Sequence, residues 1–415
     1  MLTEPLDADT ALDALKSLIE FLAGTPSALQ ILWFGLIAVL WTGYLVLEGF
    51  DFGVGMAFPF LGKNDREKRA MLTTIGPLWD GNEVWVLTAG GATFAAFPEW
   101  YATLFSAAYL PLFLILLALI VRNVGFEYRG KVDSDRWRKG WDWAISLGSW
   151  LPAVLWGVAF ANLVAGVPAR VDPLQIGTTK ILYGGNFFDL VSNPFCLLGG
   201  VVTALLFLAH GTIFTSMKTT GDLEARAKAL APKLMIAATA AAAVWAIWMQ
   251  LAYSNNTWTW GAVGIAAIAL ILACLFTFGN KYGLAFTCTT AGIASAVVLI
   301  FGSLFPNVIN ASKITLVGDA LSAIPGVDLV DGADLTPILT SVETLQGLGF
   351  EVERAVTGLP IVAASSSDLT LKLMTIVACV LVPVVLAYQA WSIWVFRKRV
   401  NADRIPASTG LAPTK

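Results

Sequence analysis

The chain has very few side chains that bind redox metals: one histidine and four cysteines among its 415 residues. The cysteines lie singly, with no CxxC pair, so the sequence supports neither a disulfide framework nor an iron–sulfur or zinc site. A haem needs an axial ligand, and several haems need several ligands. We therefore predict that this chain has no metal site and holds no haem by itself, and that His210 serves packing.

Charge is scarce as well. Only 13% of the residues are charged and 57% are hydrophobic, against roughly 25% charged in soluble domains. The sequence contains no GxxxxGK[ST] or GxGxxG phosphate-binding loop. Its formal net charge of −3 and the lack of a basic soluble segment argue against nucleic-acid binding. This composition is typical of a polytopic membrane protein.

Nine segments are long and apolar enough to cross a bilayer, whose hydrocarbon core takes roughly 20 helical residues. The first segment could continue as helix to Leu61, because its glycines bend a helix without ending it. We therefore predict an all-α polytopic membrane protein with nine transmembrane helices. The predicted spans are 29–50, 72–97, 102–122, 141–167, 193–217, 232–253, 261–279, 284–305 and 369–396.

Lysine and arginine fall unevenly among the predicted loops, and cytoplasmic loops carry an excess of them. Most of the 26 basic residues follow the odd-numbered spans or lie in the C-terminal tail, with Arg122 counted in the loop after span three. This distribution places the C-terminus in the cytoplasm. With an odd number of spans, the N-terminus is predicted to lie outside.

The segments outside the spans complete the predicted organisation. Two of them are acidic and lie on the outer side, and Thr336–Val356 within the longer one could hold a helix and a strand. The predicted units are an acidic N-terminal extension (1–28), spans one to eight (29–310), a long acidic outer loop or cap (311–368), span nine (369–397) and a basic cytoplasmic tail (398–415).

The most informative stretch is Gly76–Trp85, GPLWDGNEVW, which places Asp80 and Glu83 near the start of an apolar segment. These acids are three residues apart, as are Glu48 and Asp51 near the cytoplasmic end of span one, so each pair shares a helix face. Ionisable residues inside a membrane are costly, and chains of them mark proton relays. We predict a proton path along these four acids. The alternative is a set of buried polar groups that only join helices.

Several motifs resemble subunit II of the cytochrome bd quinol oxidases, and they span nearly the whole membrane domain. They are Glu48–Gly55 (EGFDFGVG), Gly76–Trp85, Thr88–Gly91 (TAGG), Arg122–Arg129 (RNVGFEYR), Arg136–Arg138 with Trp141–Trp143, Gly157–Asn162 (GVAFAN), Gly185–Phe188 (GNFF), and Met374–Val377 with Leu386–Tyr388.

The resemblance implies an accessory subunit that is not catalytic alone and binds no cofactor covalently. Its partner would be the haem-bearing subunit I, which holds haems b and d and the quinol site and reduces dioxygen to water. The fold implied is two four-helix bundles plus one peripheral helix, multi-pass in the bacterial cell membrane. Quinone, lipids and a small single-span subunit are further expected partners.

The resemblance also assigns roles to residues. The key acid of the proton path falls at Asp80, with Glu48 and Asp51 on its cytoplasmic approach. The neighbouring Trp79, Asn82 and Trp85 are candidate contacts for a structural quinone or for the partner. The 311–368 loop and the N-terminal extension depart from the family pattern.

Two other functions stay open from the sequence. A proton-coupled secondary transporter also needs acids in the middle of the membrane, but such proteins usually show inverted repeats, and no convincing repeat is present. A membrane scaffold without a transport path is the third reading.

Overall fold

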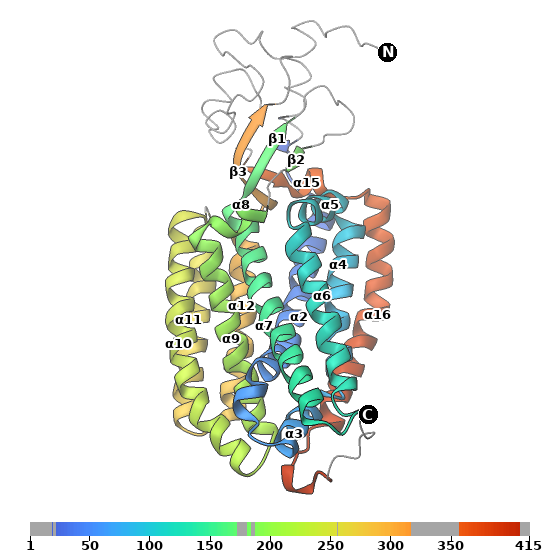
Figure 1. Cartoon of the computed structure of the whole chain (residues 1–415). Helices are drawn as coiled ribbons and strands as arrows, with labels where there is room; N and C mark the ends of the chain where they lie inside the picture. The colour runs from blue at the N-terminus through green and yellow to red at the C-terminus, as the bar shows by residue number, and fades with distance from the viewer. Residues whose placement is uncertain are drawn as a thin grey trace, which may run out of the picture.

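The computed structural model describes residues 19, 22–171, 181–183, 187–254, 256–316 and 357–406. Within these ranges the protein is a bundle of long helices with a small sheet at one end (Figure 1). The helices are α2 (Ala28–Leu61), α3 (Asp65–Ile75), α4 (Trp79–Ala96), α5 (Pro98–Ala107), α6 (Tyr109–Tyr128), α7 (Asp135–Ala165), α8 (Phe187–Ser192), α9 (Pro194–Lys218), α10 (Asp222–Ala252), α11 (Thr259–Phe278), α12 (Tyr282–Leu304), α15 (Ile361–Ala364) and α16 (Asp368–Val395), followed by a 3₁₀ turn (Ala402–Arg404).

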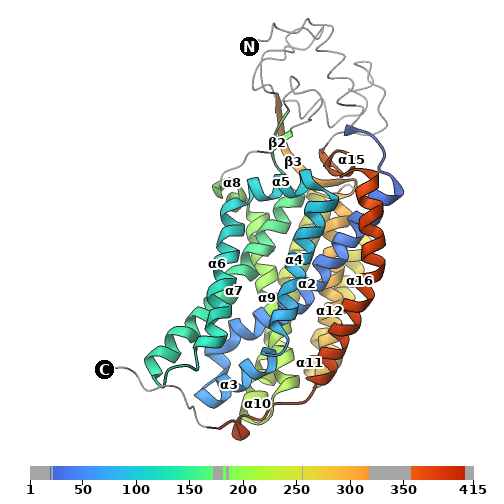
Figure 2. The ribbon, with the colours of Figure 1, turned by 90° about the vertical axis from the view of Figure 1, so that its right-hand side faces the viewer.

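The long helices form two groups and one peripheral helix, as predicted. Helices α9, α10, α11 and α12 pack together as one bundle, and α2, α4, α6 and α7 form the other. Helix α16 lies at the edge against α2 and α4 (Figure 2). The groups meet where α2 and α7 pack against α9, and α2 approaches α9 closely. There a Cβ on Gly53 would lie 1.9 Å from the carbonyl oxygen of Phe207, so glycine is required for the close approach.

Among the described residues, eight helices are long and apolar enough to span a membrane: α2, α6, α7, α9, α10, α11, α12 and α16. The prediction of a helical, multi-pass membrane protein is confirmed. Helix α4 has 18 residues and runs beside α2 through the same layer (Figure 2). Asp80, Asn82 and Glu83 lower its mean hydropathy. The count of nine spans stays a prediction that depends on α4.

The predicted span 72–97 is not one helix. Helix α3 ends at Ile75 and α4 begins at Trp79. Pro77 lies between them, has no amide hydrogen to donate to the carbonyl of Thr73, and its ring would clash with that carbonyl, so it cannot continue α3. The prediction that the first span continues to Leu61 is confirmed by α2.

The predicted span 102–122 was placed too early in the chain. The long helix here is α6, which begins at Tyr109 after the short α5. Pro111 in the first turn of α6 lacks the amide hydrogen that would continue α5. Because α6 runs to Tyr128, Arg122 lies inside the helix, and its assignment to a cytoplasmic loop was wrong.

A sheet that the all-α prediction did not include lies at one end of the bundle (Figure 1). Its strands, β1 (Val167–Val171), β2 (Ile181–Tyr183), β3 (Asn307–Leu316) and β4 (Gly358–Pro360), are ordered β2-β1-β3-β4, with β1 and β3 parallel. The ends of the predicted 311–368 loop therefore belong to the sheet and to α15. Thr336–Val356 and most of residues 1–28 lie outside the described residues.

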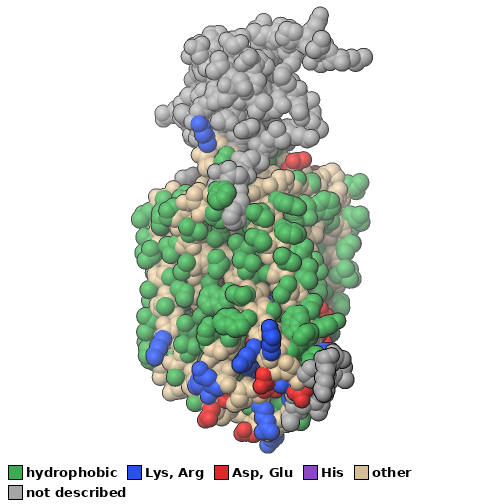
Figure 3. Space-filling view, in the orientation of Figure 1, with side chains coloured by type: hydrophobic (Ala, Val, Ile, Leu, Met, Phe, Trp, Pro, Cys, Tyr) green, Lys and Arg blue, Asp and Glu red, His purple; other side chains and the backbone are tan. Residues whose placement is uncertain are grey.

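The opposite end of the bundle carries the ion pairs. Arg129 contacts Asp142 at 2.5 Å and Asp65 at 2.9 Å, and Nζ of Lys68 lies 2.7 Å from Asp142. Figure 3 shows most charged side chains of the visible face gathered here, below a hydrophobic band. This is the end that was predicted to face the cytoplasm.

Glu67 links the turn after α2, helix α3 and helix α10 at this charged end. It lies in the first turn of α3, accepts a 2.7 Å bond from the amide of Lys63, and pairs with Arg226 of α10. Burial raises the pKa of Glu67, but the hydrogen bonds from Arg226 and from the Lys63 amide outweigh it and leave the pKa below its usual value. The contribution of Glu67 to the free energy of unfolding is therefore fully present above pH 4.5. This contribution is lost as the pH falls through the lowered pKa.

We predict that Glu67→Gln lowers the thermal unfolding midpoint by about 1–2 °C at pH 7, since the pair is partly exposed. The deficit should shrink as the pH falls below 4.5, because Glu67 of the wild type is then protonated too. Thermal unfolding of the purified protein at a series of pH values measures this. Glu127→Gln, an exposed acid near the end of α6, is the control. A deficit that grows on acidification would contradict the assignment.

Candidate functional site

Two carboxylates of α2 lie inside the helix bundle. Glu48 and Asp51 are both 0% exposed. The guanidinium of Arg122 on α6, equally buried, donates from Nη1 to Oε1 of Glu48. Phe52 and Phe126 cover this guanidinium, with ring centroids 4.8 and 5.0 Å from its Cζ. Because a buried charge is costly without a partner, Arg122 explains how Glu48 is retained in the interior.

Asp51 accepts a hydrogen bond from one side-chain amide, which is held in turn by a second amide from another helix. Asn82 of α4 donates from Nδ2 to Oδ2 of Asp51 at 2.7 Å. Gln389 of α16 donates from Nε2 to Oδ1 of Asn82 at 2.8 Å. We call Glu48, Asp51, Asn82, Arg122 and Gln389 the buried polar cluster. It joins four helices that are far apart in the sequence.

The other two predicted acids lie in different surroundings. Glu83 is half-buried and accepts a hydrogen bond from Nδ2 of Asn123 on α6. Asp80 is exposed, and it accepts no hydrogen bond from any residue that the structure describes. Three residues turn a helix by about 300°, so the side chains of Asp80 and Glu83 point roughly 60° apart. This difference is enough for Glu83 to face α6 while Asp80 faces away from the bundle.

Several polar atoms near the cluster have no hydrogen-bond partner among the described residues. They are Oε2 of Glu48, Oδ1 of Asp51, Oδ1 of Asn123, and Nε and Nη2 of Arg122. Buried polar atoms are normally paired. Each buried carboxylate thus has one oxygen bound to a fixed donor and one oxygen that can accept a proton or a further hydrogen bond.

The three residues predicted to contact a quinone or a partner are positioned differently. Asn82 is buried in the polar cluster. Trp79 is half-buried, with its ring centroid 5.5 Å from that of Phe126. Trp85 is half-buried against α2, where a Cβ on Gly43 would come within 2.2 Å of the indole. Trp79 and Trp85 therefore keep part of their surface available.

Sequence comparison identifies the family. The chain matches the family of cytochrome bd terminal oxidase subunit II over residues 29–396. This chain belongs to that family. The protein is therefore a membrane-embedded subunit of a terminal oxidase.

Curated relatives match along almost their whole length. The cytochrome bd ubiquinol oxidase subunit 2 of Bacillus subtilis (strain 168) is 40% identical over 379 residues, covering 90% of this chain and 98% of the relative. Cytochrome bd-I ubiquinol oxidase subunit 2 of Escherichia coli (strain K12) is 36% identical over 414 residues, covering 92% and 97%. The structure of bd oxidase from Geobacillus thermodenitrificans contains a chain with a TM-score of 0.61 at 12% identity, covering 89% of this chain and 97% of that one, which shows the fold alone.

The described residues of this subunit II do not suit a haem. His210 is completely buried, with Nδ1 2.6 Å from Oγ1 of Thr289. Its ring stacks on Phe286 at 4.2 Å, with the edge of Phe50 beside it, so packing leaves no room for a macrocycle. In the described part of the chain, no group of three His, Cys, Asp or Glu side chains is placed to hold a metal.

Sequence reasoning missed three residues of this subunit II site: Arg122, Asn123 and Gln389. Arg122 and Asn123 follow a long apolar run, and that position suggested the end of a span. Gln389 lies in the middle of an apolar span, and a lone amide there was the available signal for a buried polar contact. Their contacts with Glu48, Glu83 and Asn82 depend on tertiary packing.

We predict that Arg122→Met prevents assembly of this subunit, because it leaves Glu48 buried and unpaired, a loss that typically costs about 3–5 kcal/mol. The double variant Glu48→Gln/Arg122→Met should recover much of the folded yield, because no charge remains to be compensated. Fluorescence-detected size exclusion measures the yield and the midpoint of thermal unfolding. Lys281→Met, an exposed cation, is the control. Wild-type stability of the single variant would show that the pair is not structural.

Proposed function

We propose that this chain is the accessory, non-haem subunit of a membrane quinol:dioxygen oxidoreductase. It supports a haem-bearing subunit I and conducts cytoplasmic protons to the site in that subunit where oxygen is reduced to water. Family membership favours this function over a proton-coupled transporter and over a scaffold. The observation that carries the proton path is the buried polar cluster, with two carboxylates completely enclosed by helices.

The acids form a series from the interior to the surface. Glu48 and Asp51 lie one turn apart on α2, and Asn82 links Asp51 to α4. Glu83 follows on α4, and Asp80 lies one turn nearer the charged end of the bundle. In this proposal Asn82, Arg122 and Asn123 orient the carboxylates, while the carboxylates take up and release the protons.

The exposure of Asp80 supports a contact with the partner. Val84, Leu87 and Thr88 of α4 are exposed like Asp80, so Asp80 is the one charged side chain among the exposed residues of this face. A carboxylate that faces hydrocarbon is costly. Subunit I would cover this face and receive protons from Asp80, with Trp79 and Trp85 contacting the partner or a structural quinone.

The orientation follows from charge. The ion-paired end would face the cytoplasm, with the C-terminus, and the sheet would face the outside in a bacterial cell membrane. Haems b and d would be held by subunit I, and lipids, quinone and a small single-span subunit would be further partners. Protons taken from the inside and released outside by quinol oxidation would make the enzyme electrogenic without a pump.

We predict that Asp80→Asn slows oxygen reduction by about tenfold or more while haem content stays normal, because it keeps the shape but removes the titratable group. Asp80→Glu should retain part of the rate. The measurement is oxygen consumption per haem by the purified complex, with Glu127→Gln as the control. A wild-type rate per haem would remove Asp80 from the path. Loss of haem together with the rate would indicate a structural role instead.

We predict that the chain expressed without its partner shows no haem absorbance, because its one histidine is enclosed by aromatic rings. The absorption spectrum of the purified subunit in the Soret region measures this, with the assembled complex as the positive control. A stoichiometric haem spectrum that disappears in His210→Ala would contradict the proposed division of labour.

A further inference from the structure

Gln389 is the side chain through which the peripheral helix α16 reaches the buried polar cluster. Helix α16 buries only three of its side chains against the described part of the chain: Leu371, Gln389 and Ser392. Gln389 is 9% exposed, and its Oε1 lies beside Gly81 of α4, where a Cβ would come within 3.7 Å of it. Its Nε2 donates to Oδ1 of Asn82 at 2.8 Å. The amide of Gln389 therefore lies along α4 with its nitrogen toward Asn82.

The contact with Gln389 determines which way the amide of Asn82 points. A side-chain amide has one donor end and one acceptor end. Because Oδ1 of Asn82 is bound to Gln389, the donor Nδ2 is the end that faces Asp51, at 2.7 Å from Oδ2. The reverse orientation would set two donors against each other at Gln389 and two acceptors against each other at Asp51. Two hydrogen bonds would thus be lost inside the bundle, where unpaired polar groups are costly.

The orientation of Asn82 in turn decides which oxygen of Asp51 can take a proton. A hydrogen bond accepted by an amide oxygen polarises the amide and strengthens the bond that its N–H donates. Oδ2 of Asp51 accepts that bond. Oδ1 of Asp51 is buried and has no hydrogen-bond partner among the described residues. A proton on Asp51 therefore belongs on Oδ1, because Oδ2 faces a donor.

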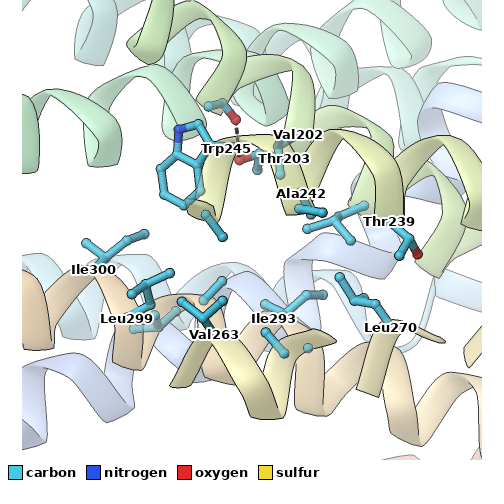
Figure 4. A pocket seen from close by; sticks show the side chains of 18 of the residues that line it. Val202, Thr203, Thr239, Ala242, Trp245, Val263, Leu270, Ile293, Leu299 and Ile300 are labelled. Carbon is cyan, nitrogen blue, oxygen red and sulfur yellow. Dashed lines mark hydrogen bonds between the residues drawn. The ribbon is translucent and has the colours of Figure 1, made fainter. Parts of the chain in front are cut away.

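The cluster is independent of the other helix bundle. Helices α9, α10, α11 and α12 enclose an apolar cavity of about 210 Å³ (Figure 4), and none of the five cluster residues lines it. Thr203 does line it, and its hydroxyl donates to the carbonyl of Gly199 at 2.9 Å (Figure 4). This hydrogen bond shares no partner with Gln389 or Asp51, so Thr203 offers a reference outside the site.

We propose that Gln389 is a positioning residue of the proton path, which holds the Asn82 amide so that Asp51 takes up its proton on Oδ1. This role rests on the proposed proton conduction, whereas the orientation of Asn82 can be tested without it. Helix α16 thus contributes to the path although it carries none of the four acids.

A double-mutant cycle in the thermal unfolding of the purified complex tests the orientation. Gln389→Met keeps the length of the side chain and removes the donor, so it should lower the unfolding midpoint. In the Asp51→Asn background it should lower the midpoint less than about half as far, because an amide at position 51 can donate or accept and no longer requires one orientation of Asn82. When Asn82→Leu is added, the effect of Gln389→Met should no longer depend on the residue at position 51.

Thr203→Val is the control for the cycle. It removes a hydrogen bond from the other bundle. Its effect on the midpoint and that of Gln389→Met should add, because distant sites that share no partner are independent.

The rate of proton uptake in a single turnover of the assembled oxidase tests the consequence for the path. Gln389→Met should slow uptake by about fivefold at normal haem content, the factor that one hydrogen bond of typical strength contributes. Thr375→Val is the matched control on α16. It removes the acceptor at 3.0 Å from Nε1 of Trp33, another side-chain hydrogen bond of this helix, and should leave the rate unchanged.

The two measurements separate two kinds of failure. Equal effects of Gln389→Met on the midpoint with and without Asp51→Asn would overturn the orientation. A wild-type rate of uptake in Gln389→Met, with Asp51→Asn slow, would overturn the role in the path. Equal slowing by Thr375→Val would make Gln389 an anchor of α16 only. A wild-type rate in Asp51→Asn would overturn the proposed function and this role with it, while the unfolding cycle would still establish or refute the orientation of Asn82.

Discussion

The buried ion pair between Glu48 and Arg122 is the interaction on which the site depends. A carboxylate in the interior of an apolar bundle is tolerated only with a partner, and Arg122 supplies one from α6. The same constraint brings Asn82 to Asp51, and Gln389 in turn to Asn82. Four helices are thereby fixed relative to one another by polar contacts inside a layer where apolar packing alone specifies position weakly.

Much of this could be predicted from local sequence. Hydropathy located the long helices, because each span must satisfy its own backbone hydrogen bonds. The spacing of Glu48 and Asp51 indicated a shared face, and both are buried. The break at Pro77 and the late start of α6 were missed, since apolar composition continues across both. The sheet was missed because β1 pairs with β3, more than a hundred residues away.

The surroundings of individual acids could not be predicted, because they depend on which neighbour each helix face meets. Asp80 and Glu83 share motif and spacing, yet Glu83 faces Asn123 and Asp80 faces outward. The rotation of α4 about its own axis within the bundle decides which of the two side chains faces α6, and sequence periodicity does not determine that rotation. The contrast fits the proposal that the enclosed acids are positioned by residues of this chain while Asp80 contacts a partner subunit.

The central claim is that the enclosed carboxylates carry protons. The most direct measurement is a single-turnover experiment on the assembled oxidase, which follows haem oxidation by oxygen and proton uptake by a pH-sensitive dye together. In Asp51→Asn the account predicts that oxygen binds at the normal rate while proton uptake is delayed by an order of magnitude. Proton uptake at the wild-type rate in that variant, with haem content intact, would contradict the account.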